Sequence, residues 1–124
     1  MVTTGGPGMG VRLGVISDTH GLLRPEVFEA FKQVDLILHA GDVGPPDLLT
    51  ELEAIAPVRA VWGNTDGFAV RKAVPEIQEL ELEGIRFVVV HGHQLGSPTP
   101  EKLVRAYPEA EVIVFGHTHR PLLT

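Results

Sequence analysis

The last apolar stretch of the chain reads Val112-Ile113-Val114-Phe115-Gly116-His117-Thr118-His119. Three of its first four residues are β-branched and a glycine ends the run, which predicts a buried strand that closes in a turn. In an extended chain residues i and i+2 point the same way, so the imidazoles of His117 and His119 can face one point, with Cα atoms about 7 Å apart. This spacing suits one or two metal ions, although an isolated pair of histidines is also typical of a hydrogen-bonded turn.

Four further apolar runs end in the same way, at polar residues that can bind a metal. These residues follow the predicted strands 11–17, 35–40, 58–62 and 85–90, in this order: Asp18 with His20, Asp42, Asn64 and His91. Each of them alone has an ordinary explanation as a turn or capping residue. The repetition of the pattern is what indicates a shared site.

Helical segments separate most of the predicted strands. They begin at Pro25 and after Pro45, and a third spans 98–107. The apolar residues of the first, at helical spacing, are expected in the core: Val27, Phe28, Phe31 and Val34. Apolar and acidic residues alternate over 77–82, and Glu83-Gly84 then leads into 85–90, which predicts a hairpin.

This order of elements predicts an α/β fold. In such sheets ligands bind beyond the carboxyl ends of the strands, and right-handed crossovers bring those ends to one side. We therefore expect one polar cluster that contains two carboxylates, three or four imidazoles and one amide oxygen. His39 falls inside a predicted strand and is expected to be a hydrogen-bonded core residue or a support for a neighbouring ligand.

Composition narrows the class of protein. At 124 residues the chain is one domain by length, and its lack of cysteine removes disulfides, thiolate nucleophiles and Cys-ligated metal sites. The net charge of −6 argues against a stable nucleic-acid complex. No apolar run is long enough to span a membrane, so a cytoplasmic protein is expected. Residues 1–10 are rich in glycine without periodicity, which predicts a flexible leader.

The number of ligands indicates more than one metal ion. A catalytic zinc usually takes three protein groups, whereas seven candidates converge here. Two divalent ions that share Asp42 would use all seven, would activate a bridging water and would leave a net positive pocket, which suits a phosphate ester. The chemistry implied is hydrolysis, and a single-metal binding module without chemistry is the less economical alternative.

Taken together, five motifs resemble the signature blocks of the calcineurin-like metallophosphoesterase superfamily. They are Asp18-Thr19-His20, Gly41-Asp42, Gly63-Asn64, His91-Gly92-His93 and Gly116-His117-Thr118-His119. In the short form found here, these motifs are most similar to those of small prokaryotic phosphodiesterases related to the retromer small subunit. The resemblance covers residues 11–124. It implies a β-sandwich flanked by helices.

The same resemblance assigns the ligands. One metal would be held by Asp18, His20 and His119, the other by Asn64, His91 and His117, and Asp42 would bridge them. A metal-bridging hydroxide would attack phosphorus in line.

Two features depart from the family pattern. Many members carry a leaving-group histidine directly after the asparagine, where this chain has Thr65. The loss of a general acid costs about 10²- to 10⁴-fold in rate, so activated esters or diesters are expected, with Asp66 or His93 as substitutes beside Asp42 and Asn64 in the catalytic set.

Relatives also continue past the last motif with further strands, so a C-terminally shortened domain with an incomplete second sheet is expected. The chain is then a piece of a longer protein, the gene itself is short, or a partner chain covers the exposed edge, and we favour homo-oligomerisation.

The sequence therefore predicts a dinuclear-metal-dependent phosphodiesterase that acts on a small phosphate ester or a nucleotide. Manganese is the first choice of metal, and nickel, cobalt, iron, zinc and magnesium are compatible with the same nitrogen and oxygen ligands. The alternative is a catalytically weak scaffold on the same fold, because the retromer small subunit serves mainly to bind partners. Four arginines are either phosphate contacts or solvated surface charges, and we favour the second for each: Arg24, Arg71, Arg105 and Arg120.

Overall fold

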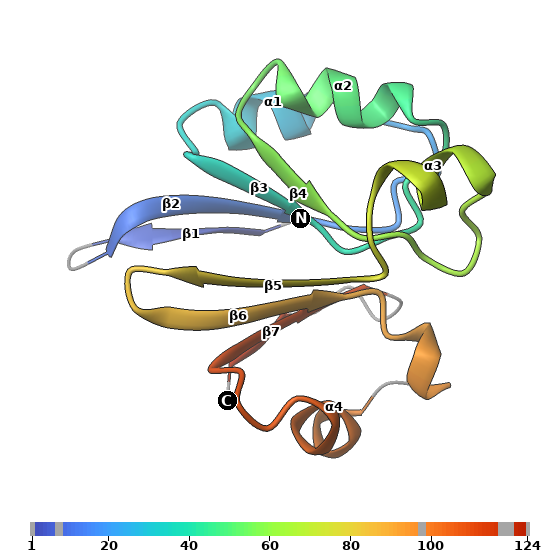
Figure 1. Ribbon diagram of the computed structural model, residues 1–124. Coiled ribbons are helices and arrows are strands. Elements are labelled where there is room, and N and C mark those ends of the chain that lie inside the picture. The colour runs from blue at the N-terminus through green and yellow to red at the C-terminus, as the bar shows by residue number, and fades with distance from the viewer. Residues whose placement is uncertain (1, 7–8, 97–98, 117–120, 124) are drawn as a thin grey trace.

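The computed structural model describes residues 2–6, 9–96, 99–116 and 121–123. These residues form two sheets that face each other, as Figure 1 shows. The first sheet has four strands in the order β1-β2-β3-β4. Their bounds are β1 Val2–Gly6, β2 Met9–Ile16, β3 Leu36–His39 and β4 Val58–Ala60. The strands β2, β3 and β4 run parallel, and β1 pairs antiparallel with β2 at one edge.

The second sheet also has four strands, in the order β5-β6-β7-β8. Their bounds are β5 Ile77–Leu82, β6 Ile85–Val90, β7 Val112–Phe115 and β8 Pro121–Leu123. A hairpin joins β5 to β6, β6 and β7 are parallel, and β8 pairs antiparallel with β7. The parallel pairs of both sheets place several strand ends at one side of the molecule.

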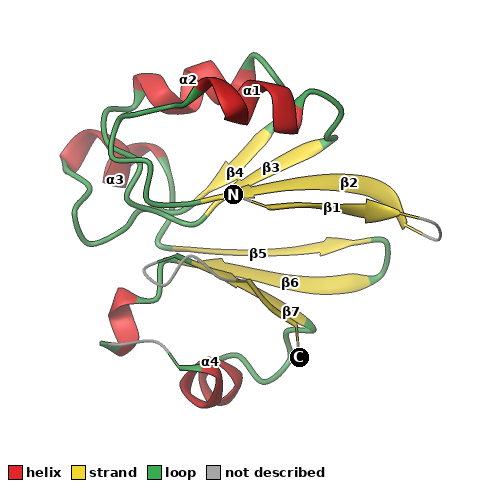
Figure 2. Cartoon of the chain, turned by 180° about the vertical axis from the view of Figure 1, so that it is seen from behind, coloured by secondary structure: helices red, strands yellow, loops and turns green. Residues whose placement is uncertain are grey.

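Helices cover the outer faces of the two sheets (Figures 1 and 2). On the first sheet lie α1 Pro25–Phe31 and α2 Asp47–Glu53, and α3 Phe68–Ala73 lies beside the strand ends. The second sheet is covered by α4 Pro100–Ala106, and the short helix η1 His93–Leu95 follows β6.

The core has three apolar layers, because strand residues alternate between the two faces of each sheet. Along β3, Ile37 packs toward the helices of the first sheet, whereas Leu38 packs between the sheets against Val89 and Val114. In the third layer, Leu103 of α4 covers Ile113. A β-sandwich flanked by helices, the architecture expected from the motifs, is therefore confirmed.

The hairpin and the strand at 112–115 have the predicted bounds, whereas η1 and β8 were not predicted, and further features differ from the predictions. Residues 2–6 form strand β1 where a leader without regular structure was expected, because backbone pairing with β2 needs no alternating side chains. The helix α3 was not predicted, since it has six residues and buries only Val70. Phe28 was expected in the core and is 44% exposed, because α1 turns only Val27 and Phe31 inward.

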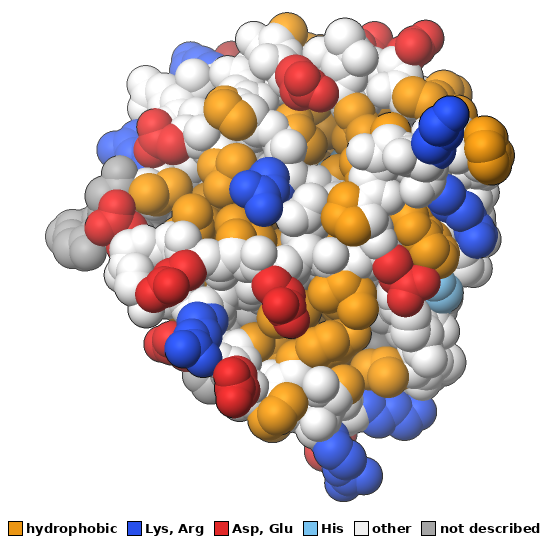
Figure 3. Space-filling view, in the orientation of Figure 1, with side chains coloured by type: hydrophobic (Ala, Val, Ile, Leu, Met, Phe, Trp, Pro, Cys, Tyr) orange, Lys and Arg blue, Asp and Glu red, His pale blue; other side chains and the backbone are white. Residues whose placement is uncertain are grey.

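The described helices include none that is long and apolar enough to cross a membrane. On the face seen in Figure 3, acidic and basic side chains are interspersed around exposed apolar ones. The large apolar side chains that are exposed among the described residues are Leu22, Phe28, Phe68, Ile77 and Val104.

Candidate metal centre

The loops that follow β2 and β3 are joined by backbone hydrogen bonds at the edge where the strands end. The Asp18 N–H donates to the carbonyl of Gly41 at 2.9 Å, and the His20 N–H donates to the carbonyl of Asp42 at 3.0 Å. These bonds continue the pairing of the two parallel strands beyond their last residues. Asp18 and Asp42 are therefore fixed side by side by the backbone.

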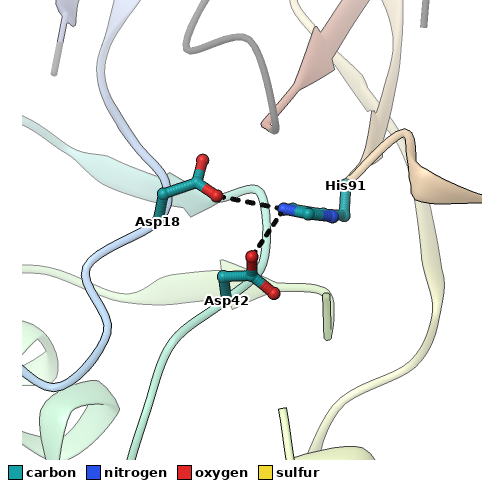
Figure 4. A group of neighbouring side chains, drawn as sticks. All are labelled: Asp18, Asp42 and His91. Atoms are coloured by element: carbon teal, nitrogen blue, oxygen red, sulfur yellow. Dashed lines mark hydrogen bonds and ion pairs between the residues drawn. The ribbon is translucent and has the colours of Figure 1, made fainter. Parts of the chain in front are cut away.

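A histidine from the second sheet completes a three-residue cluster, which Figure 4 shows. Nε2 of His91 lies 3.1 Å from Oδ1 of Asp18 and 3.1 Å from Oδ2 of Asp42. The ligand atoms of the three residues all lie within 4.8 Å of one another. His91 is fully buried and Asp42 is 4% exposed, so the cluster is shielded from bulk solvent.

The backbone at this cluster adopts conformations that L-residues rarely take. Asp18, His20 and Asp42 have φ values of 55°, 48° and 56°, in the left-handed region. Each such residue costs on the order of 1 kcal/mol or more, and residues of this kind persist where the surrounding structure holds them. Three of the four described non-glycine residues with positive φ lie here, as expected for a functional site.

Two glycines let the backbone approach the carboxylates closely. A Cβ built on Gly63 would collide with the carboxylate of Asp42. A Cβ built on Gly116 would lie 2.8 Å from Cδ2 of His91 and 3.1 Å from Oδ2 of Asp18. The end of β7 thus reaches the cluster at Gly116. His117 and His119, which come next, lie outside the described residues.

The other predicted ligands lie at the rim. The side chain of His20 is 56% exposed, and its Nε2 is 4.0 Å from Oδ2 of Asp42. Asn64 is exposed and stands between two backbone groups that contact Asp42, those of Gly63 and Thr65. The Thr65 N–H donates to Oδ1 of Asp42 at 3.0 Å, which leaves Oδ2 directed at His91.

Asp66, expected as a substitute proton donor, instead holds loops together. Its carboxylate accepts hydrogen bonds from the N–H groups of Val43 at 3.1 Å, Gly44 at 3.1 Å and Gly63 at 2.9 Å. Asp66 is 5% exposed, so these donors satisfy a carboxylate that water reaches poorly. The loops after β3 and β4 are therefore linked through this side chain.

His93, the second expected substitute, contacts a metal-ligand candidate directly. Its Nδ1 lies 3.2 Å from Nδ1 of His91, and its ring packs 5.5 Å from that of Trp62. Burial lowers the pKa of His93, the neighbouring His91 lowers it further, and Glu76 and Asp42 oppose the shift. The geometry gives His93 the role of orienting the His91 imidazole.

His39 supports the cluster from within the first sheet, as predicted. It is fully buried, and its Nδ1 accepts the Gly41 N–H at 3.1 Å. The ring proton is therefore on Nε2, which lies 3.0 Å from Oγ1 of Thr19, and that hydroxyl donates to the carbonyl of Val43 at 2.8 Å. Desolvation lowers the pKa of His39 to about 4, although nearby Asp66, Asp18 and Asp42 raise it.

The donor set fits a divalent metal ion. Two carboxylates and one imidazole are ligands for manganese, iron, cobalt, nickel or zinc, and the chain has no thiolate to select a softer ion. Nε2 of His91 lies between a carboxylate oxygen of Asp18 and one of Asp42. A divalent cation bound among these three atoms would take the place of the proton that otherwise joins the imidazole to the carboxylates. The residues present thus form a candidate metal centre.

The family of the chain follows from comparison with known proteins. The family model for the calcineurin-like phosphoesterase superfamily domain matches residues 11–124. A probable metallophosphoesterase from Methanothermobacter thermautotrophicus is 42% identical over 119 residues, which cover 90% of this chain and 68% of that protein. The chain therefore belongs to the calcineurin-like phosphoesterase superfamily, as the sequence motifs predicted.

Solved structures agree with this fold. Chaetomium thermophilum Vps29 superposes with a TM-score of 0.76 at 20% identity, over 87% of this chain and 62% of that one. A structure described as a novel archaeal phosphodiesterase gives 0.69 at 25% identity, over 87% and 73%. The chain thus spans 62% to 73% of the length of these three relatives.

Proposed function

We propose that this chain is a divalent-metal-dependent phosphoesterase and that phosphodiesters are its preferred substrates. The observation that carries the proposal is the convergence of Asp18, Asp42 and His91 at the edge where strands of both sheets end. Family membership implies the same reaction class, and the archaeal relative described as a phosphodiesterase supports the preference for diesters.

The metal centre is proposed to hold two ions, with manganese as the first choice. One ion would be held by Asp18, His20 and His119, the other by Asn64, His91 and His117, with Asp42 shared. When bound, such ions supply an activated hydroxide and positive charge for the entering and leaving oxygens. The buried position of Asp42 strengthens these electrostatic effects because little water screens them.

The residues around the centre would keep the ligands in place. The Thr65 N–H holds Oδ1 of Asp42, and His93 orients His91. Asp66 is not proposed as a proton donor, since three backbone N–H groups already occupy its carboxylate.

The substrate preference follows from Thr65, which replaces the leaving-group histidine of many relatives. A threonine hydroxyl is not a general acid at neutral pH, so the leaving group must depart without a proton from this position. A small phosphate ester or a nucleotide with a good leaving group is the proposed substrate. The exposed position of Thr65 and Asn64 leaves room for it beside the cluster.

The test is turnover of bis(p-nitrophenyl) phosphate by the manganese-loaded chain. We expect metal-dependent hydrolysis, and Asp42→Asn should lower kcat/KM by roughly 10³-fold or more, since residues that merely support metal ligands already cost about 10- to 100-fold. The control is Asp47→Asn, an exposed carboxylate at the start of α2, which should leave turnover unchanged. If the chain bound divalent ions but none of those tried supported turnover, the proposed phosphoesterase function would be contradicted and a catalytically weak scaffold would be favoured.

A further inference from the structure

The helix α3 carries an arginine that is held against the loop after β4. The guanidinium carbon of Arg71 lies 4.3 Å from the centre of the Trp62 ring. Its Nε donates to the carbonyl of Asp66 at 2.8 Å, and its Nη2 lies 3.4 Å from the carbonyl of Asn64. An exposed arginine with a ring beneath it and two carbonyl partners is fixed in place, unlike a solvated surface charge.

A single peptide group, the one between Asn64 and Thr65, connects Arg71 to the candidate metal centre. The Asn64 carbonyl that faces Arg71 belongs to the same peptide as the Thr65 N–H, which donates to Oδ1 of Asp42. With standard peptide dimensions, Nη2 of Arg71 is therefore roughly 9 Å or less from that carboxylate oxygen. A second route leads the same way, since Trp62 packs on His93 and His93 contacts His91.

The positive charge of Arg71 is not neutralised by a carboxylate within ion-pair distance among the described residues. Its hydrogen bonds go to backbone carbonyls, which fix the direction of the guanidinium but leave its charge available. An arginine in this state is suited to bind an anion, since the planar guanidinium forms paired, charge-assisted hydrogen bonds with phosphate oxygens.

We propose that Arg71, supported by the Trp62 ring, binds an oxygen of the phosphate ester on the Asn64 side of the metal centre. The inference rests on the proposed function and adds a specificity-determining residue to it. Arg71 supplies charge beside Thr65, whose hydroxyl is not a proton donor for a leaving group at neutral pH. An arginine keeps its proton at neutral pH, so it stabilises negative charge and does not protonate the leaving group.

The experiment compares four forms of the full chain: wild type, Arg71→Gln, Arg71→Lys and the control Lys72→Gln. Lys72 is the next residue of α3, is exposed, and its Nζ lies 5.9 Å from the Phe68 ring, so the control removes the same charge beside the same helix. Binding of inorganic phosphate to the manganese-loaded protein is measured by calorimetry. Manganese affinity, the unfolding midpoint, kcat and KM are measured on the same samples.

Arg71→Gln should weaken phosphate binding by about 10- to 100-fold, the range for a lost charge-assisted hydrogen bond, and should raise KM in parallel. Manganese affinity should stay within about threefold of wild type, Arg71→Lys should fall between the two, and Lys72→Gln should match wild type.

Three results would overturn the inference. The first is phosphate binding by Arg71→Gln that equals that of wild type, and the second is no phosphate binding by the manganese-loaded wild type. The third is a fall in manganese affinity that accounts for the whole loss of phosphate binding, which would make Arg71 only a support for the 64–66 loop. Because the phosphate titration needs no turnover, a wild type that binds phosphate but hydrolyses no ester would remove the proposed function and still test Arg71.

Discussion

Asp42 is the residue on which the candidate site depends most. Its backbone is held at positive φ, one carboxylate oxygen accepts the Thr65 N–H, and the other faces His91. Gly63 passes so close to this carboxylate that no side chain fits between them. The position of Asp42 is therefore set by contacts from the loop after β4 as well as by its own strand.

This close approach predicts that Gly63→Ala damages the site. The added Cβ would meet the Asp42 carboxylate and lie 2.5 Å from its backbone nitrogen, so Asp42 must move. We expect manganese affinity and turnover to fall at least about 10-fold, and the free energy of unfolding to fall by about 1–3 kcal/mol.

Gly67→Ala is the matched control, because a Cβ there would meet nothing within 4 Å and φ is −86°. Calorimetric manganese titration and chemical denaturation measure both variants. If Gly63→Ala and Gly67→Ala had the same manganese affinity and the same free energy of unfolding, the close approach of Gly63 to Asp42 would be contradicted.

At the scale of elements, His39 connects the ends of β2 and β3. Its two ring nitrogens reach Thr19, in the loop after β2, and Gly41, in the loop after β3. Protonation of Nδ1 would remove its acceptor role and place a charge in a fully buried position. The junction that positions Asp18 and Asp42 is therefore sensitive to acid.

The lowered pKa of His39 gives the sign of this sensitivity. Its pKa is about 4 in the folded chain against 6.5 when unfolded, so the unfolded chain takes up the proton first as the pH falls. The contribution to stability is complete above pH 6.5 and is lost toward pH 4, and it amounts to about 3 kcal/mol.

The free energy of unfolding of the metal-free chain, measured by denaturation between pH 7.5 and 4.5, should therefore fall more for wild type than for His39→Gln. At pH 7.5 the His39→Gln variant is expected to be the less stable of the two. If the free energy of unfolding fell by the same amount in wild type and in His39→Gln over this pH range, the proposed role of His39 would be contradicted.

The elements differ in how far the sequence predicts them. Alternation over 77–82 and the Glu83-Gly84 turn specify the hairpin locally, and the structure has the same bounds. The helix α3 has no apolar stripe, and β1 has no alternation of apolar and polar residues. Neither element can therefore be predicted from the local sequence pattern. That β4 and β5 belong to different sheets depends on long-range pairing. The resemblance to the family predicted a β-sandwich but not the point at which the chain passes from one sheet to the other.

At the scale of the whole molecule, the site joins residues from both sheets. The meeting of Asp18, Asp42 and His91 was predicted, because strand ends with metal-binding residues recur along the chain. The support from Asp66 and the placement of Arg71 on Trp62 were not predicted, since both depend on loop conformations that spacing does not encode. The assignments of His117 and His119, the metal count and homo-oligomerisation stay predictions.

The most direct test of the central claim is anomalous scattering from a crystal of the manganese-loaded chain, collected on both sides of the manganese edge. The account predicts two anomalous peaks about 3.5 to 4 Å apart, with the Asp42 carboxylate between them and His91 beside one of them. A crystal of loaded protein with no peak near Asp18, Asp42 and His91 would contradict it.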